Sequence, residues 1–136
     1  MIRPIVKDTM FLSQKAEKFE REDAFLITDL EDTLKANSES CVGMAANMIG
    51  YNKAAIIVDM PFGQLVMLNP QIIKRSGRFE VMEGCLSLKG ERKAVRFQSI
   101  EVKYQDKSFK WQRQKFSGFT AQIIQHECDH LQGIII

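Results

Sequence analysis

Hydrophobic residues follow a helical period near the start of the chain. Between residues 23 and 36, leucines recur every four residues and charged residues occupy the opposite side. This spacing places the leucines on one face, so the segment is predicted to be an amphipathic helix with that face on the core. Residues 2–6 are predicted to be extended, and the charged run 14–23 is predicted to be an exposed connection.

Shorter hydrophobic runs in the middle of the chain predict antiparallel strands. Residues 54–58 form a continuous apolar run and residues 64–68 follow after a Met-Pro-Phe-Gly sequence, so the two runs predict a hairpin. Asn69-Pro70 is predicted to turn the chain into two further extended segments, at 71–74 and 79–82.

The clearest hairpin comes from strict alternation of hydrophobic and polar residues. Residues 100–104 alternate in this way, residues 106–108 supply a turn, and the alternation resumes over residues 109–111. Several short strands at this spacing are typical of an antiparallel sheet.

The C-terminal part of the chain is predicted to be a largely buried helix. An apolar stripe runs from residue 119 to residue 131, Ser117-Gly118 can cap the start of the helix, and Gly133 suits its end. Residues 134–136 are predicted to form a short strand.

This helix carries the only two histidines of the chain, His126 and His130, in a His-Glu-x-x-His pattern with Glu127. Positions four apart lie one above the other on a helix, so both imidazoles can reach one metal ion while the glutamate stands beside them. The pattern therefore favours a metal site over an exposed helical face. Cys128 lies about 200° around the helix from His126 and is predicted to pack rather than bind metal.

A hydrolytic metal site usually needs a third protein ligand and an open fourth position. None of the residues after His130 is a good ligand, so the third must lie upstream. Cys85 is the main candidate, because it lies in a tight stretch between predicted strands. Cys41 is an alternative, in a small, apolar, glycine-punctuated stretch that is predicted to become helical at Ala45-Ala46. The working hypothesis is a Cys-His-His site with a bound water.

Such a site suits amide hydrolysis. A divalent ion held by one thiolate and two neutral imidazoles lowers the pKa of its water and polarises a carbonyl group. Glu127 can take the proton from the water and pass it to the leaving amine. Asp129 and Glu83 are candidates to orient the ligand imidazoles. Thiolate and imidazole ligands suit zinc, ferrous iron, nickel or cobalt alike.

Three stretches of the chain resemble the signature motifs of peptide deformylases. Residues 83–87 (EGCLS) and 125–133 (QHECDHLQG) match the second and third motifs in the family's order, and residues 42–46 resemble part of the first. The resemblance implies a single α+β catalytic domain over residues 1–136, with antiparallel β-sheets packed around the C-terminal helix. It also implies a hydrolase that removes the N-formyl group from the N-terminal methionine of newly made polypeptides, with Fe²⁺ as the metal in the cell.

The chain departs from the first motif of this family at two positions. Cys41 stands where the family has glycine, and Met48 stands where it has a glutamine that helps to hold the formyl oxygen as it becomes negative. In the family a backbone N–H also helps to hold the formyl oxygen, and the matching residue here is Leu86. The resemblance places Gly43 in the same part of the catalytic site. A thioether offers no N–H, and loss of one such donor in other enzymes costs about 2.7–4 kcal/mol of transition-state stabilisation. The sequence therefore predicts a deformylase of reduced activity.

The resemblance also assigns a substrate site. Matching positions predict a pocket for the methionine side chain, lined by Val42, Val81, Ile123 and His126. Arg92 matches a position that helps to hold the peptide backbone, although Lys89 stands where the family often has proline.

The length and composition of the chain limit its number of domains, its partners and its location. A length of 136 residues predicts one domain with its own core, and 45% hydrophobic and 26% charged residues are ordinary for a globular protein. A net charge of +2 requires neither nucleic acid nor membrane as a partner. Three cysteines without framework spacing, and no apolar leader, favour the cytoplasm, where new chains near the ribosome are the expected partner.

Two other functions remain open from the sequence alone. One is a metal-dependent amidase of the same fold that prefers another N-acyl substrate. The other is a protein that keeps the metal and the N-terminal pocket for binding, with little turnover.

Overall fold

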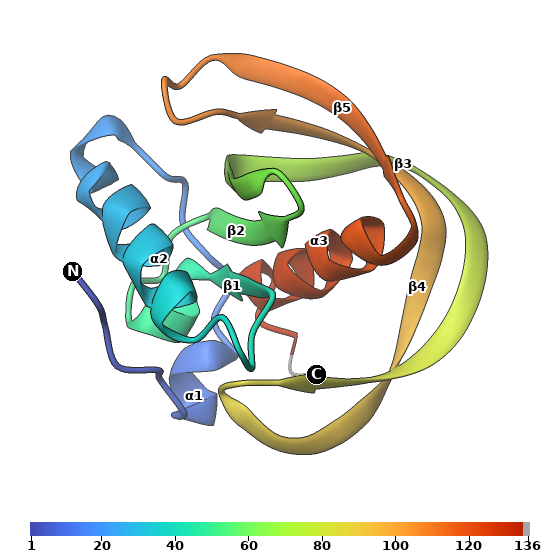
Figure 1. Cartoon of the computed structure of the whole chain (residues 1–136), viewed down its shortest axis with the longest axis horizontal. Coiled ribbons are helices and arrows are strands. Elements are labelled where there is room, and N and C mark those ends of the chain that lie inside the picture. Colours follow the sequence, from blue (N-terminus) through green and yellow to red (C-terminus); the bar gives the residue numbers. More distant parts are fainter. Residues whose placement is uncertain (135–136) are drawn as a thin grey trace.

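A computed structural model describes residues 1–134 of the chain (Figure 1). In order, the helices and strands are α1 (Thr9–Leu12), a 3₁₀ turn (Arg21–Asp23), α2 (Phe25–Ala36), β1 (Gly43–Ala45), a 3₁₀ turn (Ala46–Ile49), β2 (Ala55–Met60), β3 (Gly63–Cys85), β4 (Leu88–Gln105), β5 (Trp111–Ser117) and α3 (Gly118–Leu131). The strands form one antiparallel sheet in the order β1-β2-β3-β4-β5.

The sheet curves around α3, which confirms the predicted α+β fold with antiparallel strands around the C-terminal helix. Figure 1 shows the long strands β3 and β4 sweeping past α3, with β5 following them. The short strands β1 and β2 contact both α2 and α3. The core therefore lies where α3 meets the concave side of the sheet, and Ala121, Ile123, Ile124 and Leu131 of α3 belong to it.

The predicted leucine face of α2 is buried, with Leu26, Leu30 and Leu34 at most 1% exposed. The helix begins at Phe25, two residues later than predicted, because residues 21–23 form a 3₁₀ turn first. That turn is held by two contacts between Glu20 and Asp23: the side chain of Asp23 accepts from the amide of Glu20, and the carbonyl of Glu20 accepts from the amide of Asp23.

The prediction of a turn at Asn69-Pro70 is wrong, because β3 runs through this point without reversing. The pairing of β3 with β4 shifts register after Leu68 and again after Ile72, as in a β-bulge. Asn69 has φ 50°, which asparagine tolerates, and its side chain bonds the backbone of Phe19 in both directions. A proline cannot donate to a strand ladder, so it fits at such a bulge. The bend helps to curve the strand around α3.

Three smaller predictions also need correction. The N-terminal segment ends in a short helix, α1, which is capped by Asp8, whose side chain accepts from the backbone of Met10. Ser117 lies at the start of α3, but its side chain makes no capping hydrogen bond. The helical turn predicted at Ala45-Ala46 begins at Ala46. Of the predicted strand 134–136, residues 135–136 lie outside the described part of the chain.

Gly133 ends α3 as predicted and fixes the C-terminal turn against α1. It has φ +77°, and a Cβ there would lie 2.3 Å from the carbonyl oxygen of Ser13. The same junction is tied by a hydrogen bond from the amide of Ala16 to the carbonyl of Leu131. Among the described helices, none is long and apolar enough to cross a membrane.

Candidate metal centre

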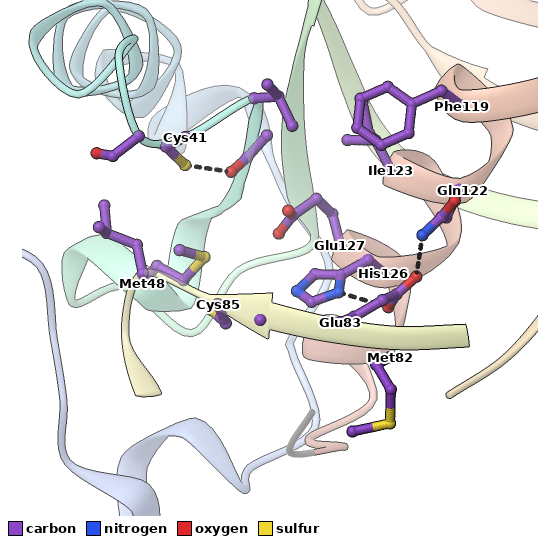
Figure 2. A pocket seen from close by; sticks show the side chains of 15 residues that line it. Cys41, Met48, Met82, Glu83, Cys85, Phe119, Gln122, Ile123, His126 and Glu127 are labelled. Carbon is purple, nitrogen blue, oxygen red and sulfur yellow. Dashed lines mark hydrogen bonds and ion pairs between the residues drawn. The ribbon is translucent and has the colours of Figure 1, made fainter. Parts of the chain in front are cut away.

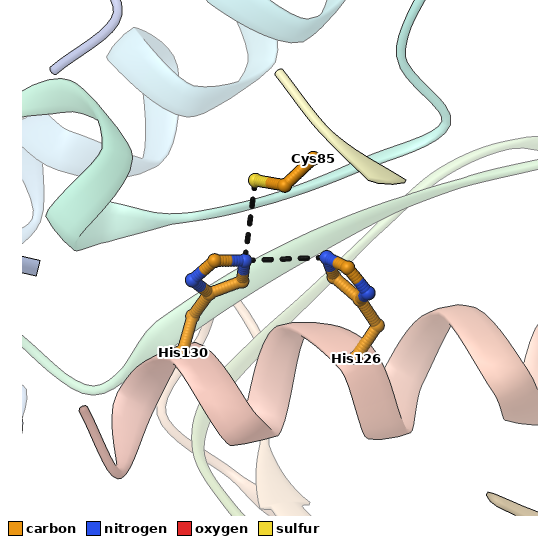
Figure 3. Close-up of side chains that lie close together, drawn as sticks. All are labelled: Cys85, His126 and His130. Atoms are coloured by element: carbon orange, nitrogen blue, oxygen red, sulfur yellow. Dashed lines mark hydrogen bonds between the residues drawn. The ribbon is translucent and has the colours of Figure 1, made fainter. Parts of the chain in front are cut away.

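The two histidines of α3 point their Nε2 atoms toward each other and toward Cys85 (Figure 3). The Nε2 atoms of His126 and His130 are 3.2 Å apart, and the Sγ atom of Cys85 is 3.3 Å from Nε2 of His130. Both imidazoles are buried, at 8% and 1% exposure. The helical spacing read from the sequence therefore produces two converging nitrogen atoms.

Cys85 reaches the histidines because it is the last residue of β3. The chain reverses there through Leu86 and Ser87, so that Cys85 pairs directly with Leu88 at the start of β4. This tight reversal holds the thiol over α3, and the three potential ligand atoms all lie within 4.8 Å of one another. Cys41, the alternative ligand, instead directs its thiol to the carbonyl of Gly43.

The spacing of the three atoms fits a tetrahedral ion. Bonds of about 2.0–2.1 Å to imidazole nitrogen and about 2.3 Å to thiolate sulfur separate tetrahedral ligand atoms by about 3.3–3.6 Å. The observed separations of 3.2 and 3.3 Å are close to these values. The third separation, between Sγ of Cys85 and Nε2 of His126, is at most 4.8 Å.

The pKa values of the two imidazoles shift in opposite directions. Burial opposes the charged imidazole, but contacts with Cys85 and Glu83 raise the pKa of His126 to about 10. Burial and the neighbouring His126 lower the pKa of His130 to about 4.

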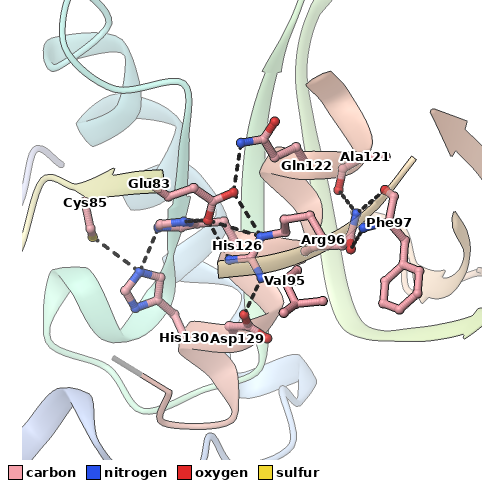
Figure 4. A network of polar contacts seen from close by, with 11 residues as sticks. Glu83, Cys85, Val95, Arg96, Phe97, Ala121, Gln122, His126, Asp129 and His130 are labelled. Atoms are coloured by element: carbon pink, nitrogen blue, oxygen red, sulfur yellow. Dashed lines mark hydrogen bonds and ion pairs between the residues drawn. The ribbon is translucent and has the colours of Figure 1, made fainter. Parts of the chain in front are cut away.

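Glu83 fixes the orientation of His126 (Figure 4). Nδ1 of His126 lies 2.8 Å from Oε1 of Glu83, and a carboxylate only accepts, so Nδ1 carries the hydrogen and Nε2 keeps its lone pair for metal. Burial opposes ionisation of Glu83, but hydrogen bonds from His126, Arg96 and Gln122 lower its pKa to about 2. Glu83 therefore stays charged and is 6% exposed, so it does not simply face solvent.

Arg96, on β4, is the residue of this network that sequence reasoning missed. Its guanidinium donates to both oxygens of Glu83, with Nη2 2.6 Å from Oε1, and its Nη1 donates to Oδ2 of Asp129 at 2.8 Å. Asp129 thus holds Arg96, which corrects the expectation that it orients an imidazole. The sequence did contain a signal for Arg96. It lies an even number of residues from Ala94 and Ile100 on the same strand, so its side chain is on the same face as theirs, and both of those residues are buried. An inward-facing arginine needs a carboxylate partner.

Glu127 lies beside the metal ligands with one oxygen free. It is 4% exposed, and its Oε1 has no hydrogen-bond partner among the described residues. Burial raises the pKa of Glu127 to about 7. The close approach of β1 to α3 requires Gly43, because a Cβ there would lie 2.6 Å from Cγ2 of Ile123 and 3.0 Å from Oε2 of Glu127. Glu127 is thus positioned to exchange a proton with a group in the adjoining pocket.

That pocket has a volume of about 260 Å³ and lies between β1, the end of β3, and α3 (Figure 2). The lining includes Cys85, Leu86, His126 and Glu127 on the polar side. Its hydrophobic lining includes Val42, Met82, Phe119 and Ile123. Val42, Met82 and Phe119 are also exposed, so the mouth of the pocket is apolar.

The structure brings Val42, Ile123 and His126 together in this pocket, as the sequence predicted, but not Val81 or Arg92. The residues of β3 that border the pocket begin at Met82, one position after Val81. Arg92 lies on β4, where its Nη1 donates to the carbonyl of Lys89 at 3.3 Å. Neither residue is among those that line the pocket in the described part of the chain.

Met48 lines the same pocket, and its sulfur faces its own helical turn. Sδ accepts from the backbone N–H of Ala45 at 3.4 Å, and the side chain is 1% exposed. Leu86, whose N–H is the predicted second donor, also lines the pocket. Met48 therefore adds bulk to the wall of the pocket without adding a hydrogen-bond donor.

The fold and the site together define a metal-dependent hydrolase, in which two of the three candidate metal ligands come from one helix. The family model of polypeptide deformylase matches residues 2–136. A peptide deformylase from Clostridium beijerinckii is 53% identical over 138 residues, with both chains covered in full. A second, from Dictyoglomus turgidum, is 35% identical over 98% of this chain and 84% of the relative.

Solved structures agree with these relatives. The crystal structure of a peptide deformylase from Legionella pneumophila superimposes with a TM-score of 0.88 at 31% identity, covering 99% of this chain and 83% of that one. The Met-Ala-Ser-bound deformylase from Acinetobacter baumannii gives 0.88 at 28% identity, over 99% and 97% of the two chains. The chain belongs to the peptide deformylase family, whose members are metal-dependent hydrolases that remove the formyl group from new polypeptides.

Proposed function

We propose that the chain is one catalytic domain in which Cys85, His126 and His130 hold a single divalent ion, beside which Glu127 transfers protons in deformylation of N-terminal formyl-methionine. The observation that carries this proposal is the convergence of three ligand atoms beside a buried carboxylate with a free oxygen. The pocket next to them is apolar at its mouth, as a methionine side chain requires.

Ferrous iron is the proposed ion in the cell. One thiolate and two imidazoles accept Fe²⁺, Zn²⁺, Ni²⁺ or Co²⁺, so the ligand set alone does not select one. Membership of the family supports Fe²⁺, and another of these ions can occupy a purified sample. When bound, the ion supplies a Lewis acid that polarises the formyl oxygen and lowers the pKa of water.

Glu127 is the proposed proton carrier. With a pKa raised to about 7 by burial, its carboxylate can accept a proton from water near neutral pH and return it. As the water oxygen bonds to the formyl carbon, the C–N bond breaks, the proton passes to the leaving amine, and formate leaves. Oε1 has no other partner in the described residues, so it can serve this purpose without giving up a structural bond.

Met48 limits the rate in this proposal. Of this chain's own groups, the N–H of Leu86 would stabilise the negative charge that develops on the formyl oxygen, whereas Met48 offers no donor. Since one such donor is worth 10²–10³ in rate in other enzymes, we infer a slow deformylase.

The peptide that follows the formyl-methionine is proposed to lie along the free edge of β1. This strand ends the sheet and borders the pocket, so an extended peptide can add to it by backbone hydrogen bonds. Val42, Phe119 and Ile123 then surround the methionine side chain. Arg92 lies outside the pocket, and its proposed role is contact with residues further along a longer peptide.

The substrate also sets the proposed location and partner. Formyl-methionyl chains arise where polypeptides are made, so we place the protein in the cytoplasm, acting near the ribosome on emerging chains. The proposal includes no specific nucleic-acid or membrane contact.

The test is deformylation of formyl-Met-Ala-Ser by protein loaded with Fe²⁺ or Ni²⁺, measured as formate released. Wild type should turn over slowly, and Met48→Gln should raise kcat by up to about 10² because the amide restores a donor. Glu127→Ala should abolish turnover while one ion per chain remains bound.

Three results would count against the proposal. Hydrolysis of acetyl peptides in preference to formyl peptides would point to a different N-acyl substrate. Peptide binding without turnover, in wild type and in Met48→Gln, would indicate a binding protein. Full activity of Glu127→Ala would remove the proposed proton carrier.

A further inference from the structure

Two sulfur atoms cover the backbone of β1 on the edge that borders the pocket. β1 is the terminal strand of the sheet, and the carbonyl of Val42 accepts from the amide of Asp59 on β2. Because successive residues of an antiparallel strand direct their backbone groups to opposite sides, Gly43 and Ala45 direct theirs away from β2. These groups form the free edge of the strand.

The partners of this edge are Cys41 and Met48. The thiol of Cys41 donates to the carbonyl of Gly43, with Sγ 2.8 Å from the oxygen. The thioether of Met48 accepts from the N–H of Ala45 at 3.4 Å. These two sulfur residues stand at the two positions where the chain departs from the first motif of its family, so both departures act on the same edge.

The contact made by Cys41 is of a kind that a peptide can replace. Burial raises the pKa of Cys41 to about 11, so the side chain remains a thiol and keeps its hydrogen for donation. A thiol is a weaker donor than an amide N–H. The side chain and the carbonyl of Gly43 both border the pocket, so an arriving backbone amide meets the thiol directly.

We propose that Cys41 is a specificity-determining residue, whose thiol occupies the Gly43 carbonyl until the backbone N–H of a bound peptide displaces it. The proposal rests on the proposed function, because it takes the peptide substrate as the occupant of the edge. Displacement of the thiol costs binding energy, so Cys41 weakens peptide binding, and most of all for peptides that offer the Gly43 carbonyl no backbone N–H in exchange.

Two substitutions of similar size make opposite predictions. Cys41→Ala removes the competing donor and should tighten peptide binding about threefold, whereas Cys41→Ser supplies a stronger donor and should weaken binding about threefold, as expected for one modest hydrogen bond. A purely structural role for Cys41 would move both variants in the same direction. Thermal unfolding of each variant checks that it is folded.

The measurement is calorimetric titration of the Ni²⁺-loaded proteins with the unformylated peptide Met-Ala-Ser, which reports binding without turnover. Raman spectroscopy gives a second readout, because the S–H stretching band absent from Cys41→Ala should shift to higher frequency when peptide releases the thiol. Tighter binding by Cys41→Ala, weaker binding by Cys41→Ser and the band shift together support the proposal.

Other outcomes overturn it in distinguishable ways. An unchanged Kd in both variants, or a change in the same direction in both, with normal deformylation, overturns the role of Cys41 and leaves the proposed function intact. An S–H band that does not move on peptide binding does the same. Absence of peptide binding in all three proteins, together with absence of formate release, overturns the proposed function and this inference with it.

Discussion

The guanidinium of Arg96 binds the carboxylate of Glu83 inside the protein, where the two side chains are only 4% and 6% exposed. Arg96 comes from β4 and Glu83 from β3, and through Glu83 the pair reaches Nδ1 of His126. The orientation of His126, a candidate metal ligand, therefore depends on Arg96, which is not itself a candidate ligand.

Replacement of Arg96 by methionine should weaken metal binding about 10–100-fold, the usual effect of losing an outer partner of a ligand. It should also destabilise the fold by about 3–5 kcal/mol, because Glu83 is left charged and buried. Competition with a chromogenic chelator measures the first effect and urea unfolding the second. Asp129→Asn serves as the control, because it leaves the Arg96–Glu83 pair in place, and an equally large loss there would contradict the assignment.

Replacement of Gly43 by alanine should reduce turnover far more than stability. The added methyl group would lie 2.6 Å from Cγ2 of Ile123 and 3.0 Å from Oε2 of Glu127, so the proposed proton carrier must move. Gly84→Ala adds a methyl group with only ordinary contacts, the nearest at 3.5 Å to the carbonyl of Gly90. Formate release and thermal unfolding of both variants make the comparison. Equal turnover in the two variants would show that the approach of β1 to Glu127 is unimportant.

Acid should destabilise the protein through Glu83. Its pKa is about 2 in the folded protein against 4.5 as the ordinary value, so its contribution to stability is complete above pH 4.5 and is lost as the pH falls toward 2. The loss is on the order of 2 kcal/mol. Urea unfolding of the metal-free protein between pH 6 and pH 2.5 should show a steeper fall for wild type than for Glu83→Gln, which has no charge to lose. Parallel curves would mean that Glu83 is not held in its charged form.

Those parts of the candidate site whose geometry depends on residues close together in the sequence could be predicted from it. Histidines four residues apart converge on any helix, and a cysteine at a tight reversal between strands is fixed within a few residues of the chain. Arg96 was missed because its partners Glu83 and Asp129 are 13 and 33 positions away, and only the pairing of β3 with β4 and the docking of α3 bring them together.

The fold shows the same division between local and distant causes. The leucine period of α2 and the hairpin of β4 and β5 follow from spacing alone. The sequence predicts a turn at Asn69-Pro70 because both residues favour turns. In the structure Asn69 instead lies at a bulge within a continuous strand, where its side chain accepts a hydrogen bond from the backbone of Phe19, a residue 50 positions away.

The central claim is that one sulfur and two imidazole nitrogens bind a single ion. X-ray absorption of the Zn²⁺-loaded protein tests it most directly. It should show one sulfur at about 2.3 Å and two nitrogens at about 2.0–2.1 Å, with the sulfur lost in Cys85→Ser and kept in Cys41→Ser. A zinc shell without sulfur, with more than one sulfur, or with a sulfur that survives in Cys85→Ser would contradict the account.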